Sequence, residues 1–268
     1  MDKGKKTKPI FALCDFVNIG IDAPVRMKAY KKYGLTHASP NWGLMFYENL
    51  EKGDDRFRLF DIAQQNGIKL DVVHLDKNVK FMWLDDPKGD KYCDFIIECI
   101  SECVGRGIKA GVFHPYQSLA EHIIPDLPKD QIGLMRLRRI VKHCEKVGFV
   151  LAVENLFSNE YLDYIFENIE SENLKMCLDT GHANITNNLF ELFEKYKDKI
   201  YCTHIHNNYG INDDHSFIDD GIIDMKRFLK LESNIKYHIL EVFPRNINNA
   251  EDYEKYVEKN VLSIKQFQ

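Results

Sequence analysis

The sequence lacks the features typical of a secreted or membrane protein. None of its seven cysteines forms a C-x-x-C pair, the count is odd, and most of them lie in apolar runs. This usage favours reduced, buried thiols over a disulfide framework, and therefore a cytoplasmic protein. The basic start MDKGKKTKP is followed by no long apolar segment, and no later run is long enough to span a bilayer. We expect no signal peptide or membrane contact, and a flexible tail over about residues 1–8.

The chain also lacks a large charge excess and a visible domain boundary. Its net charge is −5 over 268 residues, so the overall field gives a nucleic acid or an anionic membrane no electrostatic help. No Pro/Gly/Ser-rich linker, charge block or low-complexity segment divides it. With 44% hydrophobic residues, the chain is long enough for one large core. We therefore predict a single domain over residues 1–268.

What the sequence does contain is an alternation of short apolar runs with longer amphipathic runs. The apolar runs predict strands over residues 10–16, 35–42, 69–76, 110–116, 149–157, 174–185, 200–206 and 236–243. The strand over 174–185 is expected to carry Asp179 and His182 at its end. The amphipathic runs predict helices over residues 23–34, 56–67, 93–107, 131–148, 160–169, 189–199, 225–231 and 250–267.

This alternation predicts the fold class. Apolar strands separated by amphipathic helices imply a parallel sheet that is covered by helices. Eight such units in about 250 residues fit an α/β fold of the closed (β/α)₈ type, a TIM barrel. A doubly wound open sheet is the alternative, but no G-x-G-x-x-G motif follows the first strand.

Potential metal ligands are concentrated in one stretch, which runs from Tyr201 to Asp224. A short apolar run, IYCTHIH, leads there into a polar loop that is rich in histidine and aspartate. The stretch contains His204, His206, Asp213 and His215. Nitrogen and oxygen donors at the C-terminal edge of a strand suit a borderline divalent metal.

Polar residues stand near the ends of six predicted strands: His74, His114, Glu154, Asp179, His206 and Glu241. A barrel brings these strand ends together at one mouth. The last four come from consecutive strands, and they would offer three carboxylates and one imidazole to a single ion. Two of six coordination positions would remain for water or substrate oxygens. The expected cofactor is a divalent metal, and oxygen-rich ligation favours manganese, magnesium or cobalt over a structural zinc.

These residues also have structural explanations. A lone histidine in an apolar strand, such as His74, is usually a core residue with satisfied hydrogen bonds. An acid just after a strand is more often a helix cap or a loop residue. Glu154 and Glu241, however, interrupt strongly apolar strands, where a buried carboxylate is costly unless it is paired or binds a metal. We assign four other histidines to the core or the surface: His37, His122, His143 and His238.

The motifs together resemble a known superfamily. They are ENLF with Glu154, LDTGHA with Asp179 and His182, HIHNN with His206, D-x-H with Asp213 and His215, and LEVF with Glu241. This combination, spread over nearly the whole chain, resembles the xylose-isomerase-like TIM-barrel superfamily. That superfamily includes isomerases and epimerases of sugars and sugar phosphates, and DNA-repair enzymes of the endonuclease IV type. It often has His-Asp-Asn where this chain has His206-Asn207-Asn208.

The resemblance to the ketose 3-epimerase branch implies a reaction and its residues. Residues matching Glu154, Asp179, His206 and Glu241 bind one divalent metal there, and the two glutamates are the catalytic acid and base. The residue matching His182 contacts substrate oxygens. We further expect substrate contacts from other residues near the mouth: His74, His114 and Trp42. A substrate phosphate would need cations, for which Lys77, Lys80 and Arg245 are candidates.

Two other functions stay open. The endonuclease IV branch uses nine ligands for three zinc ions, and the resemblance implies that the extra metal ligands here would be His74, His114, His182, Asp213 and His215. An abasic-site nuclease would need cations around the mouth, whereas the loop after His206 carries Asp213, Asp214, Asp219 and Asp220. A non-catalytic barrel that binds a metabolite is the third function. We expect a sugar or sugar phosphate as the partner, no nucleic acid, and a homo-oligomer as an option.

Overall fold

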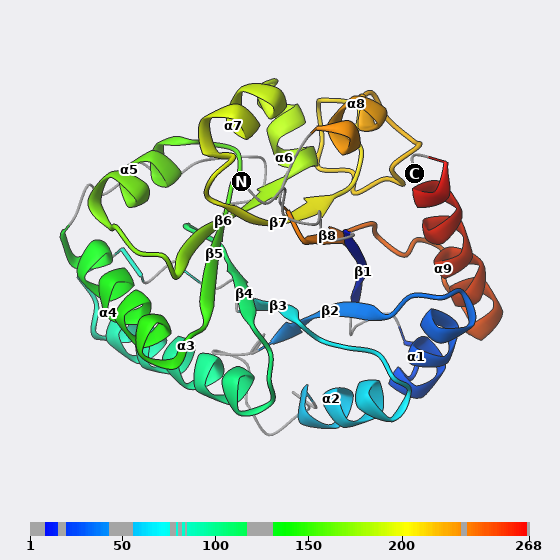
Figure 1. The fold of residues 1–268 in the computed structure, drawn as a ribbon, viewed down its shortest axis with the longest axis horizontal. Helices are drawn as coiled ribbons and strands as arrows, with labels where there is room; N and C mark the ends of the chain where they lie inside the picture. The colour runs from blue at the N-terminus through cyan, green and yellow to red at the C-terminus, as the bar shows by residue number, and fades with distance from the viewer. Residues whose placement is uncertain are drawn as a thin grey trace, which may run out of the picture.

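Figure 1 shows a ring of strands surrounded by helices. The structure is a computed structural model, and it describes residues 9–15, 20–42, 56–75, 79, 82–83, 85–116, 131–231 and 235–266. The expected tail over residues 1–8 lies outside the described residues, as do Lys77, Lys80 and His122.

Eight parallel strands close into a barrel, as the sequence predicts. Each strand pairs with its neighbours in chain order, and β8 closes the ring against β1. The strands are β1 (Ile10–Asp15), β2 (His37–Trp42), β3 (Val72–Leu75), β4 (Ala110–Phe113), β5 (Val150–Glu154), β6 (Leu174–Asp179), β7 (Ile200–Ile205) and β8 (Tyr237–Leu240).

Helices follow the strands and form the outer layer (Figure 1). In the described part of the chain they are α1 (Ala23–Lys32), α2 (Arg56–Gln65), α3 (Pro87–Gly105), α4 (Gln131–Val147), α5 (Glu160–Asn168), α6 (Thr180–Ile185), α7 (Leu189–Tyr196), α8 (Met225–Lys230) and α9 (Ala250–Lys265). Local sequence fixes several of their first residues. Helix α3 begins at Pro87, whose fixed φ suits the first helical turn, and the Asp86 side chain accepts a hydrogen bond from Lys88 N at 2.7 Å.

The predicted strand over residues 174–185 is wrong in its second half. Strand β6 ends at Asp179, and the short helix α6 begins at once. The Asp179 carboxylate accepts a hydrogen bond from His182 N at 2.7 Å, which is an N-cap. His182 therefore projects from a helix, although it lies only three residues beyond the strand.

The barrel interior places polar side chains in one layer at the mouth. Side chains two residues apart on a strand point to the same face, so an interior apolar residue predicts an interior residue two positions further on. Six strands follow this rule with a small or apolar residue and then a polar one: Val72 and His74, Val112 and His114, Ala152 and Glu154, Cys177 and Asp179, Cys202 and His204, and Ile239 and Glu241. The barrel floor is therefore apolar, and its mouth carries titratable groups.

A second core lies between the barrel and the helices. It is built from the outward residues of the strands and the buried faces of the helices, including Leu13, Leu151 and Leu178 from strands and Ile140 from α4. All seven cysteines are buried and free, in agreement with the prediction. Among the described residues, no helix combines the length and the apolarity that crossing a membrane requires.

Three histidines that we assigned to the core or the surface lie apart from the mouth layer. Each has a hydroxyl partner: His37 with Thr36, His143 with Ser101 and His238 with Thr203. This agrees with a structural role for all three.

Candidate metal centre

Ten histidine, aspartate and glutamate side chains gather at the mouth in three adjoining groups. The carboxylate cluster consists of Glu154, Asp179, His204 and Glu241. The two-histidine cluster consists of His74, His114 and Glu154, so Glu154 belongs to both. The loop cluster consists of His182, His206, Asp213 and His215. In each cluster, one donor atom from every member lies within 4.8 Å of the others, as the ligands of one ion must.

The carboxylate cluster is centred on one imidazole nitrogen. His204 Nδ1 lies 2.8 Å from Glu241 Oε2 and 3.1 Å from Glu154 Oε1. The same nitrogen lies 3.9 Å from Asp179 Oδ2. All four side chains are at most 3% exposed. Three carboxylates and an imidazole, from β5, β6, β7 and the residue that follows β8, therefore face one point.

The histidine of this cluster differs from the expected one. We expected His206 beside the three carboxylates, but the structure brings His204 there. Strand register explains the difference, because His204 is paired with Asp179 at the level of the mouth layer, whereas His206 lies one residue beyond the end of β7. His206 instead reaches Asp179 from the other side, with its Nε2 3.2 Å from Asp179 Oδ1.

The two-histidine cluster pairs imidazoles in a way that suits a metal. His74 Nε2 and His114 Nε2 are 3.2 Å apart, and they lie 3.2 and 3.1 Å from Glu154 Oε2. His74 Nδ1 lies 2.7 Å from the carbonyl oxygen of Leu75, so this nitrogen carries the proton. In the neutral ring Nε2 is then the lone-pair nitrogen, and it faces the other two donors. We expected His74 and His114 to contact substrate or metal, and their placement at the mouth suits both roles.

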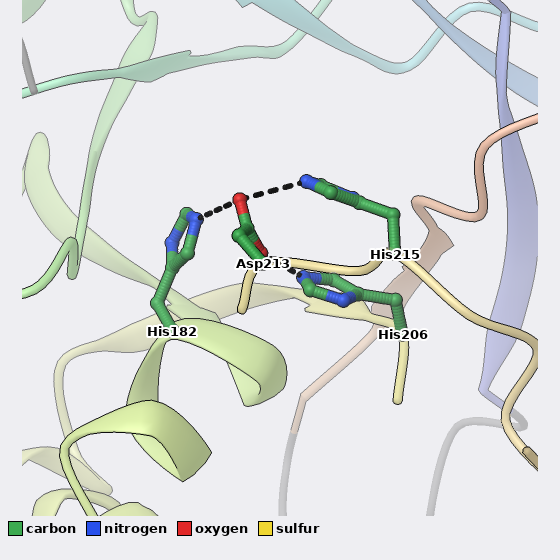
Figure 2. Close-up of side chains that lie close together, drawn as sticks. All are labelled: His182, His206, Asp213 and His215. Atoms are coloured by element: carbon green, nitrogen blue, oxygen red, sulfur yellow. Dashed lines mark hydrogen bonds and ion pairs between the residues drawn. The ribbon is translucent and has the colours of Figure 1, made fainter. Parts of the chain in front are cut away.

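The loop cluster joins a helix, a strand end and a loop. Figure 2 shows His182, His206 and His215 arranged around the Asp213 carboxylate. Asp213 Oδ2 lies 3.2 Å from His182 Nε2 and 3.0 Å from His215 Nε2. In His182 and His215 the other ring nitrogen, Nδ1, lies at hydrogen-bond distance from a backbone carbonyl oxygen. The carbonyl is that of Asn155 for His182 and that of Glu241 for His215.

In the metal-free chain, neighbouring groups of the clusters shift the pKa values of Glu154, His204 and His182. Burial alone would raise the pKa of Glu154, but His204 and His114 hold it well below its ordinary value. Burial lowers the pKa of His204, yet Glu241 and Glu154 raise it well above its ordinary value. Burial likewise opposes the charge on His182, while Asp179 and Asp213 raise its pKa to about 10. Divalent ions would replace the protons of these imidazoles as the counter-charge.

Unsatisfied atoms test whether the residues fit a metal. Among the described residues, three buried side-chain atoms lack a hydrogen-bond partner: Asp179 Oδ2, His206 Nδ1 and Asp213 Oδ1. Two of these are carboxylate oxygens within the clusters, and such an oxygen normally has a partner when it is buried. A metal ion would supply it. The donor set and the unsatisfied oxygens therefore both fit divalent metals.

Trp42 lies outside the site, contrary to our expectation of a substrate contact. Its side chain is fully buried between the barrel and the helices. The indole Nε1 donates to Glu102 Oε2 at 3.2 Å, and the ring packs edge-on against Phe57 of α2. Trp42 is the last residue of β2 and pairs with Leu75, whereas Asn41 pairs with the mouth residue His74. Because neighbouring residues on a strand point to opposite faces, Trp42 points away from the interior.

Asn207, which stands where the resembling motif often has aspartate, and its neighbour Asn208 order the loop after β7. Asn207 Oδ1 accepts hydrogen bonds from the backbone N–H groups of Asn208 and Ile223, at 2.9 and 3.0 Å. Asn208 Nδ2 donates to the carbonyl oxygen of Gly181 at 2.9 Å, which ties the loop to α6. Their role here is structural.

Gly181 makes room for His206. A Cβ atom at position 181 would lie 1.9 Å from His206 Cε1, so the imidazole would have to move. We expect Gly181→Ala to destabilise the fold by about 1–3 kcal/mol, as overpacked cores do. Thermal unfolding measures this, with Gly105→Ala as the control, because a Cβ there meets nothing within 4 Å. Equal melting temperatures for the two variants would show that His206 is not held as described.

Comparison with known proteins identifies the family of this barrel. The chain matches the family described as Xylose isomerase-like TIM barrel over residues 29–265, and it belongs to that family. An uncharacterized protein of Methanocaldococcus jannaschii, MJ1311, is 30% identical over 176 residues. That match spans 58% of this chain and 58% of the relative, somewhat more than half of each.

Solved structures share the fold over almost the whole chain. A D-tagatose 3-epimerase-like protein is 20% identical, with a TM-score of 0.69, over 96% of this chain and 98% of that one. The D-psicose 3-epimerase of Clostridium cellulolyticum H10 is 13% identical, with a TM-score of 0.72 and the same coverage of 96% and 98%. A zinc-bound IOLI protein is 17% identical, with a TM-score of 0.68, over 96% of both chains. At these identities the likeness shows the fold alone.

Proposed function

We propose that the protein is a divalent-metal-dependent isomerase or epimerase of a sugar or sugar phosphate. The carboxylate cluster carries this proposal. Glu154, the last residue of β5, and Glu241, the residue after β8, approach the same His204 nitrogen, and all three side chains are buried at the barrel mouth. Two carboxylates that face one ion-binding point can serve as the base and the acid of a proton transfer next to a carbonyl.

The ion and the two glutamates would divide the chemistry between them. A bound divalent ion supplies Lewis acidity, which makes a C–H bond beside the substrate carbonyl more acidic. Glu154 or Glu241 removes this proton as the general base. Return of a proton by the other glutamate, from the opposite face, inverts the carbon. Return by the same glutamate to the neighbouring carbon moves the carbonyl.

Two further observations support this proposal. Proteins with the same fold include a D-tagatose 3-epimerase-like protein and a D-psicose 3-epimerase, and both of these names refer to sugar substrates. The carboxylate cluster also has the oxygen-rich composition that suits manganese, magnesium or cobalt. The expected substrate contact of His182 has less support, because both of its ring nitrogens are engaged, with Asn155 and Asp213.

A three-metal phosphoester hydrolase is the second candidate, and the other two clusters favour it. Glu154 is shared between the carboxylate cluster and the two-histidine cluster, which is how a bridging carboxylate joins two ions. The acidic loop after β7 opposes a DNA substrate, because Asp214, Asp219 and Asp220 lie there without basic residues among them. Arg245, the candidate phosphate cation, bonds the backbone carbonyl of Asp214 in the same region.

Deuterium exchange tests the proposed function. We expect metal-loaded protein, incubated with a panel of ketoses and ketose phosphates in deuterated water, to incorporate deuterium next to the carbonyl of one of them. Mass spectrometry measures the uptake, and metal-free protein is the control. Cleavage of an abasic oligonucleotide without deuterium uptake would contradict the proposal in favour of the hydrolase. Bound metal without either reaction would favour a metabolite-binding barrel.

A further inference from the structure

We infer that the loop cluster is a closed structural zinc site in which His206 is the fourth protein ligand. Three imidazole nitrogens and one carboxylate oxygen, from His182, His206, Asp213 and His215, lie within 4.8 Å of one another. Structural zinc sites have four protein ligands, whereas catalytic ones keep a position open for water or substrate. The site would fix the loop after β7, and it would take no part in binding substrate.

The donor distances suit a tetrahedral ion. Ligands about 2.0–2.1 Å from a tetrahedral zinc lie roughly 3.3–3.4 Å from one another. In this cluster, Asp213 Oδ2 is 3.2 Å from His182 Nε2 and 3.0 Å from His215 Nε2. Asp213 Oδ1 is 3.7 Å from His206 Nε2. These three separations, which involve both oxygens of the Asp213 carboxylate, lie within about 0.4 Å of the value that a tetrahedral ion would impose.

Two of the imidazoles are already in the correct tautomer. His182 Nδ1 and His215 Nδ1 lie 2.9 and 2.6 Å from the backbone carbonyl oxygens of Asn155 and Glu241, which accept only N–H donors. In the neutral rings the lone pairs are therefore on Nε2, and both Nε2 atoms face Asp213. Such a bond on the far nitrogen is the usual support of a metal-binding histidine.

His206 is held in place by its surroundings. Its ring stacks on that of His215, with 4.0 Å between centroids and 16° between planes. Its backbone N–H and carbonyl both bond Thr180 Oγ1, at 3.2 and 2.8 Å. The facing oxygen, Asp213 Oδ1, is buried and has no hydrogen-bond partner. An ion shared between His206 Nε2, which also lies 3.2 Å from Asp179 Oδ1, and this oxygen would give the oxygen its missing partner.

The backbone conformation at His215 also agrees with a metal ligand at this position. His215 has φ of 44°, in the left-handed region that a non-glycine residue enters only at some cost. Its imidazole is nevertheless directed at Asp213, two residues earlier, and stacks on the ring of His206. Ligation by residues from three segments would offset the cost and hold the loop over the mouth.

The closed site separates the two candidate functions. The two-histidine cluster offers three donors and so leaves a position open, but the loop cluster would have none left for a phosphate oxygen. A third ion held in this way could not assist phosphoester cleavage. The inference does not rest on the proposed isomerase, because metal binding is measured without turnover.

Cobalt substitution tests the ligand role of His206. We expect metal-free protein titrated with Co²⁺ to bind one equivalent with the intense visible absorption of a four-coordinate site. His206→Gln should weaken the binding of that equivalent about tenfold or more and remove most of the absorption. Glutamine can still donate to Asp179, so a role limited to orienting Asp179 predicts no such loss. His238→Gln is the matched control, because His238 is also buried but bonds Thr203, outside the cluster.

X-ray absorption of the wild-type protein with one equivalent of zinc avoids variants altogether. We expect a four-coordinate ion with three imidazoles and one oxygen, since the nitrogen-rich cluster should fill first. A five- or six-coordinate ion, or a shell with only one or two imidazoles, would overturn the inference. So would a His206→Gln variant with unchanged cobalt affinity and spectrum.

Discussion

Glu241→Gln is expected to lower the rate of substrate proton exchange by about 10²–10⁴-fold, the range that a general acid or base contributes. Glu241 is 2% exposed, and its carboxylate lies 2.8 Å from His204 Nδ1. An amide at this position keeps the size of the side chain but cannot accept a proton. Deuterium uptake by the substrate, measured at saturating metal and followed by mass spectrometry, gives the rate.

Glu154→Gln should have an equal or larger effect, because Glu154 belongs to two clusters. Its carboxylate contacts His74, His114 and His204. Glu258→Gln is the control, since Glu258 is an exposed residue of α9. Normal turnover by either the Glu154 or the Glu241 variant would show that the acid and base are assigned wrongly. A normal circular dichroism spectrum in each variant would exclude unfolding as the cause.

The fold was predictable because hydrophobic periodicity follows directly from the geometry of strands and helices. All eight strands lie within runs that the sequence marks, and the order of elements required parallel pairing. Helix α6 escaped prediction for a physical reason. Its six residues, TGHANI, are too few to show a helical repeat, and they follow an apolar strand without a break. The sequence predicts Asp179 as a metal ligand, and in the structure Asp179 both belongs to the carboxylate cluster and caps α6.

The sequence predicted which residues form the site better than it predicted which of them lie together in one cluster. Nine of the ten side chains in the clusters were named from the sequence, and the tenth, His204, was noted in the stretch that contains it. Alternation along β7 gives Cys202, His204 and His206 the same face, so sequence alone does not rank the two histidines. What decides which histidine joins the carboxylates is its height along the barrel axis. The pairing of Asp179 with His204 places His204 at the height of the carboxylates. For Trp42 the height was predictable but the direction was not, because a position near the mouth does not say whether a side chain points into the barrel or toward the helices.

Removal of metal is expected to lower the melting temperature by about 8–16 °C for each site that was filled. A ligand at 1,000 times its dissociation constant stabilises the folded state by about 4 kcal/mol. For a domain of this size, each kcal/mol corresponds to about 2–4 °C. Differential scanning calorimetry with and without a chelator measures the change. Restoration by manganese, cobalt or zinc is the control, and an unchanged melting temperature would contradict a metal centre.

The stabilisation by metal should also grow as the pH rises. In the metal-free chain, burial opposes the charge on His182, but Asp179 and Asp213 raise its pKa from 6.5 to about 10. The proton on His182 therefore stabilises the metal-free fold fully below about pH 6.5, and this contribution is lost as the pH rises toward 10. The metal-bound chain needs the neutral imidazole, so it loses nothing over that range. Melting temperatures of the two forms should consequently diverge between about pH 6.5 and pH 9, and a constant or narrowing difference would show that protons and metal do not compete for these imidazoles.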